Sequence, residues 1–187
     1  MVPDSEPPSL VLIAGPIAAG KSAVSRRLAD DLRVSGQQVA LVELDALADM
    51  ARPTLPDWTV AHRIFASVTG QWLLADMDVV IAESVSNRAE LQLVLGHVPV
   101  GTPVLTVAVS CRFEVALERA LADPTRGISR DADFLRGVHE QWAEESPLFP
   151  VDLALDSGTT PLAESVRRIR SALAVTPPAP PGQDSVS

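Results

Sequence analysis

The sequence predicts an α/β fold in which a parallel sheet is covered by helices on both faces. Short runs of apolar residues recur along the chain, and they are continuously apolar rather than alternating, as is typical of strands buried on both faces. Segments with helical periodicity separate these runs, as the crossover connections of a parallel sheet require. A glycine-rich loop between the first apolar run and a helix supports the same fold.

The 187 residues suit a single domain. Seven of the 16 prolines lie near the two ends, so we expect disordered tails at 1–8 and 176–187 and a folded domain at 9–175. Five strands are expected, in this order: Leu10–Ala14, Val39–Leu44, Val79–Ala82, Val104–Val109 and, more weakly, Leu153–Leu155.

Besides a helix that follows the fourth strand and carries Arg119, four helices are expected, three of them from the spacing of their apolar residues. The first begins near Lys21. The second has Asp57 as its N-cap. It carries an apolar stripe that is expected to lie in the core, formed by Trp58, Ala61, Phe65, Val68 and Trp72. The third, with Asp131 or Asp133 near its start, is marked by Phe134, Val138 and Trp142. The fourth, opened by Thr160 as a cap and Pro161 in the first turn, is marked by Leu162, Val166, Ile169 and Leu173.

Residues 15–22 form a complete phosphate-binding loop (P-loop), Gly-Pro-Ile-Ala-Ala-Gly-Lys-Ser, between a strand and a helix. Its glycines allow backbone conformations in which N–H groups surround phosphate oxygens, and the helix directs its positive end at the same anion. We expect Lys21 to reach the β- and γ-phosphates and the Ser22 hydroxyl to bind Mg²⁺. The predicted contacts to the nucleotide from this loop are Gly15, Ala18, Ala19, Gly20, Lys21, Ser22 and Ala23.

Charge and composition exclude several other classes of function. The net charge of −9 disfavours general binding to nucleic acids or anionic membranes. Cys111 is the only cysteine, which excludes an intrachain disulfide and a cysteine-rich zinc site. The sequence shows neither a signal peptide nor an apolar run long enough to span a membrane, so a cytoplasmic protein is expected.

Acidic residues follow the second and third strands at the carboxyl edge of the sheet, where ligands of such sheets bind. Asp45 is the candidate general base for an acceptor hydroxyl, and Glu43, which shares its side-chain parity, is the rival. A structural alternative for Asp45 is a helix N-cap at Ala46. Glu83 is expected to hold Mg²⁺ or to contact the acceptor.

Three further segments carry candidate residues. Ser84 and Arg88 follow Glu83 and either line an acceptor pocket or, for Arg88, belong to a solvated helix. Arg126 and Arg130 lie in a predicted lid at about 123–140, where arginines would neutralise the moving phosphoryl group; the alternative is surface ion pairing with nearby aspartates. Arg119 is expected at the adenine or the phosphates.

The loop that begins at Asp156 follows the fifth strand. It is expected beside the P-loop, where adenine could rest against it; a plain turn is the alternative.

Taken together, the P-loop, Asp45, Glu83, the arginine-bearing lid and the Asp156 loop resemble the small P-loop kinases. The chain is most similar to the chloramphenicol phosphotransferase-like and zeta-toxin-like kinases, and less so to shikimate and gluconate kinases. The resemblance implies a three-layer α/β/α fold with strand order 2-3-1-4-5, ATP and Mg²⁺ as cofactors, and a small hydroxyl compound as acceptor. The sequence lacks the acid and arginine pattern that shikimate binding requires, and it contains no tyrosine.

We therefore expect an ATP-dependent kinase, monomeric or homodimeric, that phosphorylates a hydroxyl group of a small molecule. Lys21, Asp45, Arg126 and Arg130 are its predicted catalytic residues. Two alternatives remain open at this point: a P-loop NTPase in which hydrolysis drives a conformational switch, and a nucleotide-binding module without catalysis. The acceptor and the choice between ATP and GTP are left open by the sequence.

Overall fold

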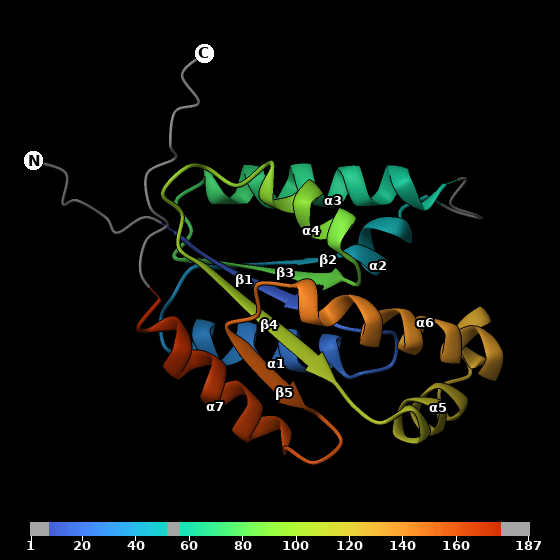
Figure 1. Cartoon of the computed structure of the whole chain (residues 1–187). Coiled ribbons are helices and arrows are strands. Elements are labelled where there is room, and N and C mark those ends of the chain that lie inside the picture. The colour runs from blue at the N-terminus through green and yellow to red at the C-terminus, as the bar shows by residue number, and fades with distance from the viewer. Residues whose placement is uncertain (1–7, 52–56, 177–187) are drawn as a thin grey trace, which may run out of the picture.

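A computed structural model of the chain describes residues 8–51 and 57–176. Its centre is a parallel five-stranded sheet in the order β2-β3-β1-β4-β5, which confirms the predicted fold class and strand order (Figure 1). Most of the predicted tails, at 1–7 and 177–187, lies outside the described residues.

Each predicted strand is present, with small changes at its ends. The strands are β1 (Ser9–Ala14), β2 (Val39–Glu43), β3 (Val79–Val85), β4 (Val104–Ser110) and β5 (Leu153–Asp156). β3 runs three residues further than its apolar core and passes through Glu83, because the pairing with β1 and β2 continues there. β2 ends one residue earlier than predicted, because the chain turns into a helix at Leu44.

The α-helices of the described residues are α1 (Lys21–Val34), α2 (Leu44–Ala48), α3 (Trp58–Leu73), α4 (Arg88–Leu95), α5 (Phe113–Ala122), α6 (Ala132–Glu145) and α7 (Leu162–Leu173). Two short 3₁₀ turns, Ile128–Arg130 and Ser146–Leu148, flank α6. The Asp57 and Asp131 side chains cap α3 and α6 as predicted, by accepting hydrogen bonds from the amides of Thr59 and Phe134. The capping residue of α7 is Pro161 rather than Thr160, and no side chain caps that helix.

Side chains of the central strand alternate between two hydrophobic cores. Leu10 and Leu12 point to the face covered by α3 and α4, whereas Val11 and Ile13 point to the face covered by α1 and α7 (Figure 1). This alternation is the consequence of strand geometry, and it explains why β1 is apolar without interruption.

The tryptophans of α3 correct one sequence prediction. Trp58 and Trp72 are 53% and 42% exposed, although they were expected in the core. The buried face of α3 packs in one core with residues of the sheet and of α4, and Gly70 lies so close to the His97 backbone that a methyl group there would be 2.5 Å from the His97 carbonyl oxygen. The middle of the apolar stripe, including Phe65, is therefore buried, whereas its two ends are exposed to solvent.

Gly15, the first residue of the P-loop, is expected to be essential for stability. It has φ +145°, and a Cβ atom there would lie 2.0 Å from the Val109 carbonyl oxygen. Gly15→Ala should lower the free energy of unfolding by about 3 kcal/mol or more, because backbone strain and overpacking add. Gly36→Ala is the matched control, since Gly36 has φ +90° but open space around it. It should cost about 1 kcal/mol. Equal losses in urea denaturation would contradict the steric argument.

Candidate active site

The P-loop connects β1 to α1 at the carboxyl edge of the sheet. Gly20, the residue before α1, has a left-handed backbone conformation (φ +92°), and Ala18 also has a positive φ of 61°. Such turns direct successive N–H groups into one concave site, and the first turn of α1 adds amides that have no partner within the helix. Anion binding at this point is therefore built into the backbone.

Lys21 is buried against the loop, and its Nζ donates a hydrogen bond to the Pro16 carbonyl oxygen at 2.8 Å. It is the only lysine in the sequence. Burial lowers the pKa of Lys21, and the negative charges of Glu83 and Asp45 oppose this shift. The charges of these two predicted acids thus both act on the Lys21 ammonium group.

Glu83 is also buried, near the end of β3. It follows Val79 and Ile81 on the strand face that packs against α1, which explains how it meets a residue of that helix. Burial raises the pKa of the Glu83 carboxyl, while the Lys21 charge and a hydrogen bond from the Ser22 side chain lower it. A hydroxyl and a carboxylate oxygen side by side are the kind of donors that Mg²⁺ prefers.

The second carboxylate, Asp45, lies in the first turn of α2 and is exposed. The suggested helix cap at Ala46 is wrong: α2 begins at Leu44 and its N-cap is Glu43. The parity argument that made Glu43 a rival also fails, because the strand ends before Asp45. Glu43 instead accepts a hydrogen bond from Arg26 Nε at 2.9 Å. Of these two acids, only Glu43 takes part in an ion pair within residues 8–51 and 57–176.

Arg119 of α5 joins the P-loop to the loop between β5 and α7. Its Nη1 and Nη2 donate to the Ser157 hydroxyl and carbonyl, each at 2.9 Å, and Ser157 Oγ donates to the Ala19 carbonyl at 2.5 Å. The Asp156 loop therefore lies beside the P-loop, as predicted. The Asp156 carboxylate accepts a hydrogen bond from the Gly158 amide at 2.8 Å, so it also stabilises the turn in this loop. Ser157 is not among the residues predicted for the site from the sequence.

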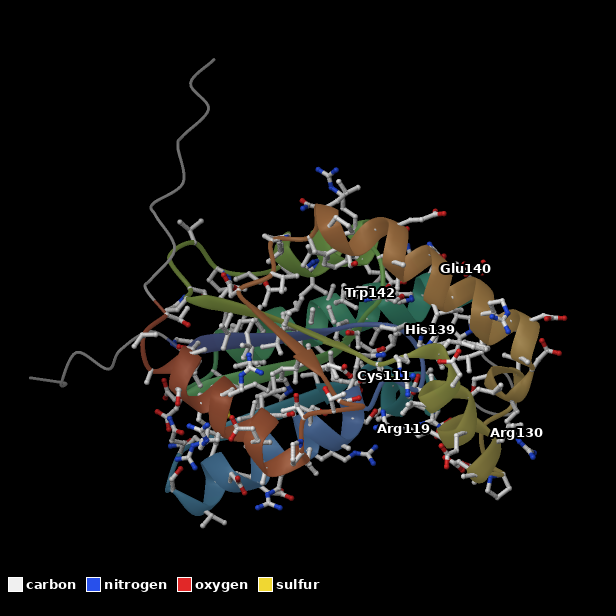
Figure 2. All side chains as sticks on the ribbon, turned by 60° about the horizontal axis from the view of Figure 1, so that its bottom comes forward. Cys111, Arg119, Arg130, His139, Glu140 and Trp142 are labelled. Atoms are coloured by element: carbon white, nitrogen blue, oxygen red, sulfur yellow. The ribbon has the colours of Figure 1, made fainter. Side chains whose placement is uncertain are left out.

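The two arginines of the predicted lid differ in their surroundings. Arg126 pairs with Asp123 at 3.2 Å, and its positive charge contributes to the lowered pKa of Lys21. Arg130 is exposed, and Figure 2 shows it at the outer edge of this region, away from Arg119. Surface ion pairing, the alternative considered for these residues, is thus present for Arg126.

The segment after Glu83 is irregular. Ser84 has φ +152° and forms a bulge, because Ile13 pairs with Glu83 and Ala14 pairs with Val85. Arg88 is exposed at the start of α4, and its backbone amide donates to Glu145 at 2.9 Å. The solvated-helix interpretation of Arg88 fits this position.

His139 is a residue of the site that the sequence analysis missed. Its Nε2 lies 2.9 Å from the Ile17 carbonyl oxygen of the P-loop. The ring also makes an edge contact with Phe113, at 6.0 Å between centroids. Figure 2 shows His139 and Trp142 on the inner side of α6, whereas Glu140 lies on the outer side. The available signal was its helical spacing of four from Leu135 and three from Trp142, both buried.

His139 is expected to make stability depend on pH. Burial, with a smaller effect of the Lys21 charge, lowers the pKa of His139 below its usual 6.5, although the Ile17 contact opposes this. Below pH 6.5 the unfolded chain then binds more protons than the folded chain, so stability is lost as pH falls. His139→Gln should reduce this loss between pH 7.5 and 5.5 in urea denaturation. An unchanged or steeper loss would contradict the assigned direction.

Within residues 8–51 and 57–176, no group of three or more histidine, cysteine, aspartate or glutamate side chains could hold a metal ion. A Mg²⁺ ion here would therefore depend on Ser22, Glu83, phosphate oxygens and water rather than on a protein cage. In the same residues, no helix has the length and apolar character needed to cross a membrane.

Comparison with protein families gives a match to the family described as chloramphenicol phosphotransferase-like protein, over residues 33–174. The matched range is well over half of the chain. It begins after the P-loop, so the family match and the P-loop motif are separate lines of evidence. No curated protein matches the sequence significantly.

Solved structures with the same fold include several kinases. A gluconokinase from Sinorhizobium meliloti is 22% identical, covering 91% of this chain and 94% of its own, with a TM-score of 0.62. A shikimate kinase from Bacteroides thetaiotaomicron is 14% identical, covering 89% and 99%, with a TM-score of 0.65. A sugar kinase from Janibacter is 18% identical, covering 90% and 96%, with a TM-score of 0.63. At these identities the likeness concerns the fold alone.

Proposed function

The chain belongs to the chloramphenicol phosphotransferase-like family, and from this premise we propose that it transfers the γ-phosphoryl group of ATP to a hydroxyl of a small molecule. The observation that carries the proposal is the convergence on Lys21. A buried lysine in a P-loop, with the carboxylates of Glu83 and Asp45 acting on it, combines phosphate binding with acidic groups for a metal and an acceptor.

The residues have the following proposed roles. The P-loop amides and the start of α1 bind the phosphates, and Lys21 leaves the Pro16 carbonyl to contact their oxygens. Ser22 and Glu83 would hold Mg²⁺, which supplies charge neutralisation between the phosphates when bound. Asp45 orients the acceptor hydroxyl and accepts its proton. Arg126 and Arg130, in a lid at 123–140, stabilise the transferred group, and Arg119 and Asp156 lie at the nucleotide.

A turnover assay tests this function. ADP formation is followed with Mg·ATP or Mg·GTP, with and without panels of hydroxylated antibiotics, sugars and nucleosides, and ³¹P NMR identifies any phosphorylated product. We expect at least one acceptor to accelerate ADP formation and to appear as a phosphate ester. Turnover that no acceptor changes would favour a switch NTPase instead. Tight nucleotide binding without any turnover would favour a module without catalysis.

A further inference from the structure

Two carbonyl oxygens of the P-loop are held by side chains from distant parts of the chain. His139 of α6 contacts the Ile17 carbonyl at 2.9 Å, and Ser157, in the loop after β5, donates to the Ala19 carbonyl at 2.5 Å. A carbonyl can only accept, so the His139 Nε2 must carry a proton. Arg119 in turn holds Ser157 through two hydrogen bonds of 2.9 Å.

Because peptide groups are planar, these contacts also determine the directions of two N–H groups in the loop. In a planar trans peptide the C=O of one residue and the N–H of the next point in opposite directions. The Ile17 carbonyl is held toward His139, so the Ala18 N–H points away from it. The Ala19 carbonyl is held toward Ser157, so the Gly20 N–H points away from that side chain.

The two amides turned in this way are unpaired. Neither the Ala18 nor the Gly20 N–H donates to a backbone carbonyl in the described part of the chain. Both residues have positive φ, 61° and 92°, the conformation from which anion-binding nests are built. For alanine this conformation is unfavourable, and it persists where surrounding contacts impose it. Ala18 is also packed in a small core with Ala116, Ala120 and Leu135.

We infer that His139 and Ser157 are positioning residues that fix the Ala18 and Gly20 amides in the orientation that phosphate oxygens require. The inference rests on the proposed function, because it assumes that this loop binds a triphosphate. It differs from the role of Lys21, whose bond to the Pro16 carbonyl must break when phosphate is bound. The His139 and Ser157 contacts are made on the carbonyl side of these two peptides, opposite the amides, and they stay in place when phosphate binds.

Calorimetric binding to the full chain tests this inference with three probes: Mg·ATP, inorganic tripolyphosphate and adenosine. His139→Ala and Ser157→Ala should each weaken tripolyphosphate and ATP binding about tenfold, the size expected for one lost hydrogen bond. Adenosine binding to His139→Ala should change less than about twofold, because adenosine has no phosphate. His139→Gln and Ser157→Thr, which keep a donor at these positions, should recover most of the affinity for tripolyphosphate.

Matched controls remove the same kind of bond elsewhere. His97→Ala deletes an imidazole contact to the Leu93 carbonyl at 3.0 Å, and Ser35→Ala deletes a hydroxyl bond to the Leu32 carbonyl at 2.8 Å. Neither should alter tripolyphosphate binding. Unchanged tripolyphosphate affinity in the P-loop variants would overturn the inference. So would an equal loss of tripolyphosphate and adenosine binding in His139→Ala with a lowered melting temperature, which would indicate a purely structural role. A wild-type chain that binds no tripolyphosphate or ATP would overturn the proposed function itself.

Discussion

Lys21→Ala is expected to abolish phosphoryl transfer while the chain stays folded. Lys21 is the buried cation of the P-loop, and in the proposed reaction its ammonium stabilises the charge that develops on the phosphates. Loss of one such preorganised group in a water-poor site lowers kcat/KM by about 10³-fold. The fold should survive, because burial of the ammonium itself is unfavourable, as the lowered pKa of Lys21 indicates. Steady-state kinetics and thermal unfolding of the two proteins measure both effects.

Chemical labelling provides a second test of the same residue. Because Lys21 is the only lysine, an amine-directed acylating reagent has one side-chain target besides the N-terminal amine. The lowered pKa of Lys21 increases its neutral, reactive fraction. Mg·ATP should protect Lys21 from the reagent, with mass spectrometry of peptides as the readout. Full turnover by Lys21→Ala, or equal labelling with and without ATP, would contradict the assigned site.

Local patterns were sufficient to predict the parts of the molecule that depend on local geometry. The P-loop motif and its flanking residues predict a strand, a turn and a helix within residues 10–29, because glycine conformations and the start of a helix are local properties. The apolar runs predicted five strands, and the family resemblance supplied their order, which the sheet confirms. That order places Asp45, which follows β2, and Glu83, which lies near the end of the adjacent strand β3, at the same carboxyl edge of the sheet.

The predictions that failed depended on where helices begin and on how each helix is rotated about its axis relative to its neighbours. The spacing of Trp58 and Trp72 is helical, but their exposure depends on the rotation of α3 toward α4, which sequence spacing does not contain. The short helix α2 was missed because five residues are too few for a periodic signal. Strand parity was then extended past Glu43 to Asp45, where no strand exists.

His139 and Ser157 were missed for a different reason. The contact between His139 and Ile17 joins residues 122 positions apart, and that between Ser157 and Ala19 joins residues 138 apart. No local pattern encodes such pairs. Ser157 could have been suspected from topology, because β5 is two places from β1 and its carboxyl end faces the same edge. For His139 the sequence offers only a histidine on the apolar face of α6.

Asp45→Asn is expected to lower kcat by about 100-fold or more while leaving the KM for ATP nearly unchanged. The amide keeps the size of the side chain but cannot accept the proton of an acceptor hydroxyl. Asp45 lies exposed in the first turn of α2, and its negative charge acts on Lys21. Single-turnover kinetics with the acceptor identified by screening separate the chemical step from nucleotide binding.

Glu43→Gln is the matched control, because it removes a nearby carboxylate that has no role in the proposed reaction. Glu43 is the last residue of β2, two positions before Asp45, and it is already paired with Arg26 at 2.9 Å. A pairing of this kind on a partly exposed surface contributes about 1 kcal/mol or less to stability, so the variant should fold and turn over within about tenfold of wild type. If Glu43→Gln loses as much kcat as Asp45→Asn, the base has been misassigned, since the carboxylate held by Arg26 would then be the one that matters. If only Asp45→Asn loses kcat, the turn from β2 into α2 explains why Asp45 rather than Glu43 acts as the base. The chain leaves the sheet at Leu44, so Asp45 is not paired with α1, whereas Glu43 is paired with Arg26 of that helix.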